Sequence, residues 1–339
     1  MKCVSISGKK KLVLKDINKP VSKNGAVVIE VKSCGICGSD IHNWDMGNSI
    51  GLVMGHEFAG VVVDPGSRQD LKKGDRVTGL PISPCGKCDA CTSGNVQYCA
   101  DTWTDAVGLS LSNPGAYAEY TSCRASMVRK LPGNVSYDAA CMVEPSAVSL
   151  HAINLANIKI GDSVLIIGGG IIGLMAAEFA KMNGASKVIL IETNKKRGRK
   201  AVSYGKVDAY YDALDEKTIP NLLTMTNGGF DKVIECCGNS AAVSEALMCV
   251  KAGGCVVLVG VSVGNVSIPS VVAVMKEIKM QGAIAYKPSE FDECLQLIAS
   301  KKINVTKYID DVISLEQAQE AFERLTNGKD AAVKIIFKP

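Results

Sequence analysis

The 339-residue sequence has no long block of like charge and no long uninterrupted apolar run. Lys and Arg number 38 against 34 Asp and Glu, which gives a formal net charge of +4 without a basic arm. Segments that bind nucleic acid are usually marked by such blocks, so we expect no nucleic-acid partner. The longest apolar stretch, residues 164–180, is broken by glycines and Glu178 and is shorter than the roughly 20 residues that span a bilayer. We therefore expect no membrane segment.

A secretory signal peptide is also missing from the first residues, MKCVSISGKKKLVLKD, because a run of lysines interrupts the apolar core that such a peptide needs. The sequence nevertheless holds 14 cysteines. In reducing compartments stable disulfides are rare, and clustered thiols more often bind metal. We therefore expect a cytoplasmic protein that uses some of its thiols as metal ligands.

The length favours two domains, since single cores rarely grow beyond about 250–300 residues. Residues 1–148 are predicted to be mostly β, with Pro, Gly and Asp between short strands. Residues 149–286 alternate β-branched strands with helical stretches, as a doubly wound parallel sheet requires. Residues 287–339 contain two helices and one strand, too little to cover a core, so we expect them to return to the first domain. The predicted fold class is α/β.

Four cysteines fall within one short stretch, CGKCDACTSGNVQYC, with the spacing C-x2-C-x2-C-x7-C. Gly86 and Gly94 allow so short a loop to turn all four sulfurs toward one point. Four thiolates at tetrahedral reach form a closed zinc site that leaves no coordination position for a substrate. We therefore expect a structural zinc, bound by Cys85, Cys88, Cys91 and Cys99.

A glycine motif, G-x-G-x-x-G, follows the strand predicted at residues 164–167 and begins a predicted helix. In that context it predicts a dinucleotide site, with a tight turn at Gly168, backbone approach to the pyrophosphate at Gly170 and close helix packing at Gly173. The cofactor-binding residues expected in this turn are Gly168, Gly169, Gly170, Ile171, Ile172 and Gly173.

An acidic residue, Glu192, ends the next predicted strand, at the distance from the glycine motif that suits a ribose-binding carboxylate. Its charge would repel a 2′-phosphate, so the sequence favours NAD over NADP. NADP stays an alternative, because Lys195, Lys196 or Arg197 would hold a phosphate if Glu192 turned away. Arg197 is therefore counted among the expected cofactor-binding residues.

A second metal site is indicated by Cys37, His56 and Glu57, which fall within one β-rich stretch of a chain that has only three histidines. A catalytic zinc requires about three protein ligands and one open position. Cys37, His56 and a carboxylate meet that requirement, and either Glu57 or Glu144 can supply the carboxylate. A zinc-protease helix is excluded, because Gly60 stands where its second histidine would be.

These motifs, in this order, resemble the zinc-dependent medium-chain dehydrogenases, the family of alcohol, sorbitol, butanediol and threonine dehydrogenases. The resemblance covers nearly the whole chain and includes GICGSDIH, GHEFAG, GDRV, the four-cysteine stretch, EPSAVSLHA and GGGIIG. It implies a GroES-like β catalytic domain around a Rossmann domain. It also implies two zinc ions per chain, with Glu57 and Glu144 exchanging at the catalytic one.

The resemblance further implies a reaction. Zinc acts as a Lewis acid on the substrate hydroxyl, and NAD accepts a hydride from the carbinol carbon. Ser39, His42 and Glu57 are the implied catalytic residues, with Ser39 passing a proton toward the ribose and His42 releasing it to solvent. An imidazole suits this step because its pKa lies near neutrality.

The substrate is expected to be a small secondary alcohol or a vicinal diol. Ser146 and Ala285 differ from the residues usual in sorbitol dehydrogenases, which makes sorbitol itself less favoured. A sugar-alcohol phosphate and an amino alcohol of the threonine type remain alternatives, as does a non-catalytic nucleotide-binding protein of the same fold. A short-chain dehydrogenase is excluded, because no tyrosine is followed four residues later by lysine. We also expect a homotetramer or homodimer, since the last strand of the parallel sheet would otherwise be an exposed edge.

Overall fold

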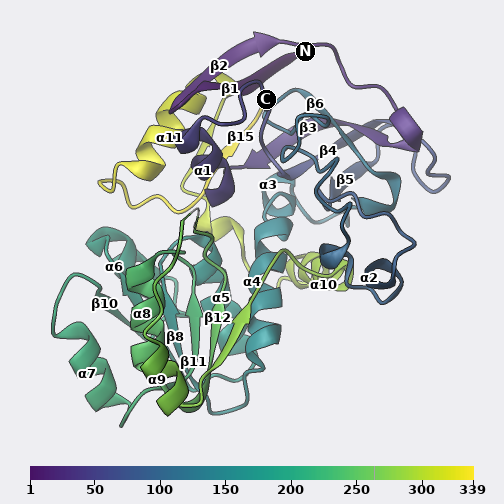
Figure 1. Cartoon of the computed structure of the whole chain (residues 1–339). Helices are drawn as coiled ribbons and strands as arrows, with labels where there is room; N and C mark the ends of the chain where they lie inside the picture. Colours follow the sequence, from purple (N-terminus) through teal and green to yellow (C-terminus); the bar gives the residue numbers. More distant parts are fainter. Residues whose placement is uncertain (263) are drawn as a thin grey trace. The chain divides into compact units, whose positions relative to one another are not determined.

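The computed structural model describes residues 1–262 and 264–339, which form two compact units (Figure 1). Unit 1 contains Met1–Ala147, Tyr286–Asn327 and Lys334–Pro339. Unit 2 contains Val148–Ala285 and Gly328–Val333. Within the described residues, none of the helices has the length and apolar character needed to cross a membrane.

Unit 1 is built on a β-sheet in which strands from both ends of the chain lie side by side. The purple β3 and the yellow β15 are neighbours in Figure 1, and they pair antiparallel with Ile336 opposite Gly35. The order along the main sheet is β14-β15-β3-β4-β5-β7, with β6 paired to β3, while β1 and β2 form a separate hairpin. The strands are β1 (Lys2–Gly8), β2 (Lys11–Asp16), β3 (Val27–Gly35), β4 (Glu57–Asp64), β5 (Arg76–Gly79), β6 (Tyr120–Cys123), β7 (Val128–Lys130), β14 (Asp311–Ile313) and β15 (Ile335–Phe337).

Short helices fill the connections of unit 1. They are α1 (Gly38–Met46), α2 (Asp89–Thr92), α3 (Tyr137–Ala140), α10 (Pro288–Ala299) and α11 (Ala318–Thr326), and α4 (Val143–Ala156) continues from unit 1 into unit 2. The core contains aromatic side chains from distant segments, with Tyr117 packed edge-on against Phe322 and Phe337. This packing fixes the C-terminal segments against the N-terminal strands.

Unit 2 is a six-stranded parallel sheet with the order β10-β9-β8-β11-β12-β13. Numbered from β8, this is the order 3-2-1-4-5-6 of the doubly wound Rossmann fold, in which ligands bind beyond the carboxyl ends of the strands at the switch between the first and fourth. The strands are β8 (Ser163–Ile167), β9 (Lys187–Glu192), β10 (Ala209–Asp212), β11 (Phe230–Glu235), β12 (Val250–Leu258) and β13 (Lys279–Gly282). The helices are α5 (Ile171–Met182), α6 (Lys195–Ser203), α7 (Thr218–Met225), α8 (Ser240–Cys249) and α9 (Ser270–Met275).

The predicted α/β class, with a β-rich domain and a doubly wound parallel sheet, is confirmed by these two sheets. The segment expected to return whole to the first domain, residues 287–339, divides differently, because Gly328–Val333 groups with unit 2. The reason is local hydrogen bonding. The side-chain amide of Asn194 donates to the carbonyls of Gly328 and Asp330, at 3.1 and 2.8 Å.

Candidate metal centre and nucleotide site

The sheet of unit 1 brings three candidate ligands together at the start of β4. Cys37 caps the N-terminus of α1, shortly after β3, whereas His56 directly precedes β4 and Glu57 is its first residue. Because Gly35 pairs with Glu57 across the two strands, the turn after β3 lies beside the first residues of β4. One ligand atom each from Cys37, His56 and Glu57 lies within 4.8 Å of the others.

A buried carboxylate, Asp40, holds this cluster from the α1 side. It is fully buried, and its Oδ2 accepts hydrogen bonds from the Cys37 N–H at 3.0 Å and from the Tyr117 hydroxyl at 2.6 Å. Its Oδ1 lies 3.6 Å from Nδ1 of His56. Burial disfavours a charged imidazole, but Asp40 and Cys37 outweigh that effect and raise the pKa of His56 well above its ordinary value. Carboxylates commonly orient metal-binding imidazoles in this way.

Glu144, the alternative carboxylate, lies outside this set of ligand atoms in the described chain. It is buried in α4, and burial raises its pKa to about 7, while His56 lowers the pKa and Glu57 raises it. The charges of His56 and Glu57 therefore shift the pKa of Glu144, but its carboxylate is not among the clustered ligand atoms of the described residues. Glu57 is the carboxylate that the structure brings to Cys37 and His56.

The chemistry of the donor set fits zinc, since thiolate sulfur, imidazole nitrogen and carboxylate oxygen are its usual protein ligands. A second observation agrees with the first. Oε1 of Glu57 is buried and has no hydrogen-bond partner within residues 1–262 and 264–339. Leaving a buried carboxylate oxygen unsatisfied is costly, and a cation at this point would satisfy it.

Two further residues of sequence interest lie on α1. Ser39 is exposed and His42 is partly buried. They are three residues apart in a helix, so their side chains share one face. Asp40 lies between them in sequence and points into the cluster instead. On α1, Asp40 thus points into the cluster, whereas Ser39 and His42 lie on a more exposed face.

The four-cysteine stretch forms a compact lobe, defined as residues 85–99, with its four sulfurs within 4.8 Å of one another. Backbone N–H groups point at these sulfurs, including Cys85 N to Cys99 Sγ and Gly86 N to Cys91 Sγ, both at 3.3 Å. The N–H of Cys85 lowers the pKa of Cys99 to about 6, whereas burial raises that of Cys91 to about 12. The lobe is a fit for a closed tetrathiolate zinc site.

The glycine turn of unit 2 joins β8 to α5. Gly168 has φ +102°, a value that disfavours any other residue, and a Cβ on Gly173 would lie 2.0 Å from the Gly168 carbonyl oxygen. A Cβ on Gly170, which caps α5, would meet nothing within 4 Å. Ile171 and Ile172 form the first turn of α5, whose N–H groups lack helical acceptors. This open, N–H-lined space fits a pyrophosphate.

Glu192 ends β9 and lies against this turn. Its Oε2 accepts a hydrogen bond from the Gly169 N–H at 2.8 Å, and its Oε1 accepts from the Asn194 N–H at 2.8 Å and from the Thr193 hydroxyl at 3.1 Å. The side chain is only 6% exposed. Turning it away would break two bonds to backbone N–H groups, so Glu192 is fixed in place.

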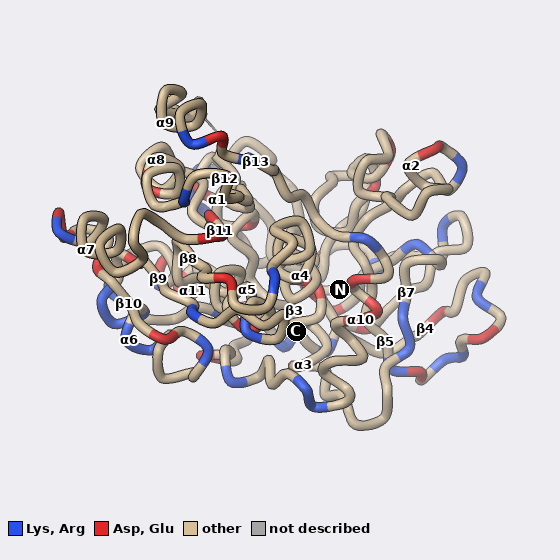
Figure 2. The backbone as a smooth tube through the Cα atoms, turned by 90° about the horizontal axis from the view of Figure 1, so that it is seen from below, with Lys and Arg blue, Asp and Glu red and all other residues tan. Residues whose placement is uncertain are grey.

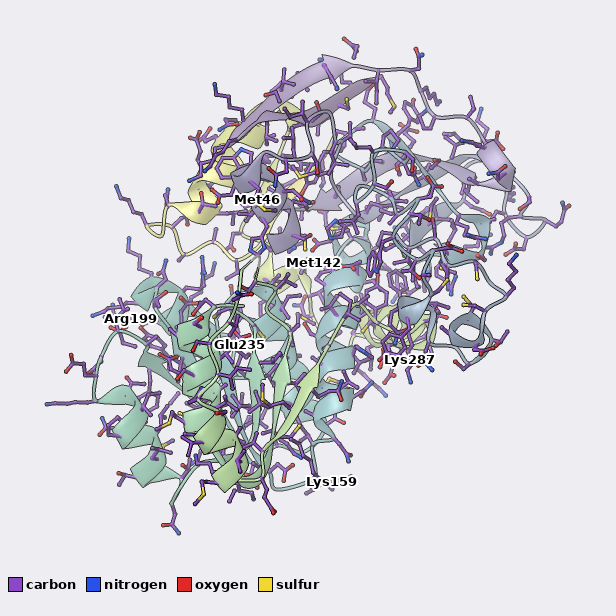
Figure 3. All side chains as sticks on the ribbon, in the orientation of Figure 1. Met46, Met142, Lys159, Arg199, Glu235 and Lys287 are labelled. Carbon is purple, nitrogen blue, oxygen red and sulfur yellow. The ribbon has the colours of Figure 1, made fainter. Side chains whose placement is uncertain are left out.

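The basic run after Glu192 forms α6, the blue stretch at that label in Figure 2. Arg197 donates to the Ala332 carbonyl at 3.2 Å, and its Nη1 lies 3.7 Å from Oε2 of Glu192. Lys195 pairs with Asp212 at 3.0 Å. Arg199, labelled in Figure 3, also belongs to α6. Arg197 thus has protein partners that compete with a phosphate.

Sequence reasoning assigned no role to four buried residues. Glu235, labelled in Figure 3, ends β11 and closes the turn beside the glycine motif by accepting from the Cys237 and Gly238 N–H groups, at 2.6 and 2.8 Å. Asp40 and Tyr117 support the ligand cluster, and Lys334 pairs with Glu57. Asp40 had a signal in the sequence, its place three residues after Cys37. The other three had none.

Comparison with known proteins gives matches over both units. Residues 23–133 match the alcohol dehydrogenase GroES-like domain, and residues 172–300 match the zinc-binding dehydrogenase domain. The sorbitol dehydrogenase of Bacillus subtilis is 31% identical, with 100% of this chain and 97% of the relative covered.

Two solved structures are also similar. The 2R,3R-butanediol dehydrogenase of Bacillus subtilis has a TM-score of 0.87 and 29% identity, covering 100% of this chain and 99% of that one. A putative zinc-binding dehydrogenase from Sinorhizobium meliloti, bound to NADP, has a TM-score of 0.88 and 29% identity, with the same coverage.

Removing metal from the lobe is expected to open it. Lys87 is exposed at its tip, and without a cation the four thiols would lose their metal bonds and keep only weaker contacts such as those from the Cys85 and Gly86 N–H groups. We expect a strong chelator to speed trypsin cleavage after Lys87 at least about tenfold, since a loss of about 1.4 kcal/mol of local stability increases the open population tenfold. Cleavage after exposed Lys301 serves as the control and should not change. Equal rates at Lys87 with and without chelator would contradict a metal-held lobe.

Proposed function

The chain belongs to the zinc-dependent medium-chain dehydrogenase family, and from that premise we propose that it oxidises a secondary alcohol or vicinal diol reversibly to a ketone, with NAD as hydride acceptor. The observation that carries this proposal is the convergence of Cys37, His56 and Glu57 in unit 1. The nucleotide-fitting turn of unit 2 supports it. A non-catalytic protein of this fold would have no need for the second ligand cluster.

Cys37, His56 and Glu57 would hold the catalytic zinc, with Glu144 as a second carboxylate close by. When bound, zinc supplies Lewis-acid polarisation of the substrate hydroxyl, and NAD supplies the hydride acceptor. The chain's own residues do the rest. Asp40 orients His56, burial excludes water from Glu57, and the fixed strand pairing of Gly35 with Glu57 keeps the ligand spacing constant.

Ser39 and His42 are proposed to carry the proton released by the substrate. Their shared face on α1 and their greater exposure than Asp40 support a path from the site toward solvent. Histidine suits the outer position, because imidazole side chains commonly serve as proton shuttles.

The similarity to dehydrogenases of sorbitol and of 2R,3R-butanediol supports a polyol or vicinal diol as substrate. Ser146 has less bearing on this choice than its position in the sequence indicates. It is fully buried, and its hydroxyl donates to the carbonyl of Met142 at 2.6 Å, a residue labelled in Figure 3. The hydroxyl is therefore used in a local hydrogen bond at the start of α4. Sugar-alcohol phosphates and amino alcohols remain the competing substrate classes.

The activity test is a panel of diols, polyols, amino alcohols and sugar-alcohol phosphates, followed by NADH absorbance. We expect oxidation of a diol or polyol by protein that contains about two zinc ions per chain. His56→Ala should lower kcat/KM by about 10³-fold or more, because Lewis-acid stabilisation amounts to several kcal/mol. It should also lower the zinc content to about one. One zinc in the unaltered chain, with no turnover of any panel member, would favour the non-catalytic alternative.

NAD is proposed as the preferred coenzyme. Glu192 is fixed by the N–H groups of Gly169 and Asn194, so its charge stays where a 2′-phosphate would bind. The similar Sinorhizobium meliloti protein was crystallised with NADP, so the alternative is a real one. Arg197 would favour NADP only if Glu192 moved away from it, because its guanidinium could then bind a 2′-phosphate.

Glu192→Ala is expected to reduce the preference for NAD. A hydrogen bond to a charged group contributes about 1.5–3 kcal/mol, so the ratio of kcat/KM for NAD to that for NADP should fall about 10- to 150-fold. Steady-state kinetics with both coenzymes measures this ratio. Glu216→Ala, an exposed glutamate of the same unit, is the matched control. An unchanged ratio in Glu192→Ala would remove Glu192 from coenzyme selection.

A homo-oligomer is proposed through the β13 edge of unit 2. All four residues of β13 are exposed, and the strand ends the parallel sheet. Next to it in sequence, α9 exposes Val271, Val274 and Met275, at 68, 73 and 78%. An open sheet edge beside exposed apolar side chains is a pairing surface that proteins seldom leave uncovered.

Val274→Glu should convert the oligomer to a monomer, because a two-fold interface would bring two copies of the new charge together. Light scattering after size-exclusion chromatography gives the mass. Ile160→Glu adds the same charge at another highly exposed apolar position of unit 2 and should leave the oligomer intact. An unaltered chain that is already monomeric would refute the proposed oligomer.

A cytoplasmic location is also proposed, without membrane or nucleic-acid partners. All fourteen cysteines of the described chain are free thiols, and the lobe would bind metal only in that reduced state. Lys and Arg alternate with Asp and Glu along the backbone tube in Figure 2.

A further inference from the structure

Lys334 is a charged residue in the interior of unit 1. Its side chain has 0% exposure and comes directly before β15. The ammonium donates to Oε2 of Glu57 at 2.6 Å and to the Ile36 carbonyl at 2.7 Å. One lysine from the C-terminal end of the chain therefore contacts both segments that present the candidate metal ligands.

Stability alone does not account for this lysine. Replacing a buried ion pair by apolar residues is often neutral or stabilising, because both charges lose their hydration. Position 35 of β3 is also a glycine, and the missing side chain leaves room for the ion pair. A Cβ on Gly35 would lie 2.0 Å from Oε2 of Glu57. The arrangement is therefore one that positions the carboxylate, at a cost in packing.

The two oxygens of Glu57 have different surroundings. Oε2 is held by Lys334, whereas Oε1 is buried without a hydrogen-bond partner in the part of the chain that the structure describes. A lysine on one oxygen leaves the other as the oxygen that a metal can use. The contact to Ile36, one residue before Cys37, ties the same ammonium to the thiol-bearing turn.

Charge balance points the same way. The cluster brings the thiol of Cys37, which would bind metal as a thiolate, together with the carboxylates of Glu57 and Asp40, and the buried Lys334 pairs with Glu57. With a dication bound, these charges cancel. Without Lys334, the loaded centre would keep one buried negative charge.

We propose that Lys334 is a positioning residue for the metal centre, which holds Glu57 through Oε2 so that Glu57 binds the ion through one oxygen. The proposal rests on the metal site proposed above. It assigns Lys334 no contact with substrate or coenzyme. Its effect on the metal is carried by Glu57.

The test is zinc release from the purified holoenzyme to a chromogenic chelator, which separates the metal of the lobe from that of the cluster by rate. Loss of a residue that orients a metal ligand typically lowers affinity 10- to 100-fold. We expect Lys334→Met to weaken the cluster zinc by that amount and to leave the lobe zinc unchanged. Cobalt substitution should show an altered absorption band, because Glu57 changes its coordination.

Lys338→Met is the matched control, since Lys338 pairs with Asp138 at 3.0 Å and is about half exposed. It should keep both zinc ions at the original affinity. A folded Lys334→Met protein with unchanged cluster affinity and cobalt spectrum would overturn the proposal. An unaltered chain with only one zinc would refute the metal site itself, which is a separate result.

If Lys334→Met does not fold, Glu57→Gln and the double variant Glu57→Gln/Lys334→Gln decide the matter. Once the carboxylate is gone, replacing Lys334 should change cluster affinity by no more than about twofold, the usual error of additivity. A further tenfold loss would overturn the proposal, because Lys334 would then act by a route that does not involve Glu57.

Discussion

The pairing of β3 with β4 is the constraint on which the proposed metal centre depends. It sets Gly35 opposite Glu57, so the turn that carries Cys37 lies beside the residues that begin β4. A shift of one residue would move every side chain of a strand to the opposite face. Glu57 would then leave the cluster and lose Lys334. The register is itself held by β15, whose Ile336 pairs with Gly35 from the other side.

Much of both sites could be predicted from the sequence, because their motifs are local. The lobe cysteines fall within 15 residues, and the glycine turn is contiguous, so spacing alone defines which residues can meet. The choice between Glu57 and Glu144 could not be made in this way. It depends on the register of two strands and on the direction of side chains, which no spacing in the sequence reports.

The roles of Lys334 and Tyr117 could not be predicted from the sequence for a related reason. Lys334 is separated from Glu57 by 277 positions, and a lysine near a chain end usually indicates a solvated surface. Only the return of β15 to the sheet of unit 1 makes it an interior residue. The strand β15 groups with unit 1, whereas residues Gly328–Val333, two of which accept hydrogen bonds from Asn194, group with unit 2.

The two sites hold their acidic residues by different means, and the difference follows from what each carboxylate would bind. Glu192 is anchored by backbone N–H groups, which fix its position without cancelling its charge. That suits a neutral ribose diol, and it keeps the charge that disfavours a 2′-phosphate. Glu57 is anchored by a full cation. Beside a thiolate and a second carboxylate, amide donors would leave excess negative charge in the interior, whereas the positive charge of Lys334 would balance the centre once a dication is bound.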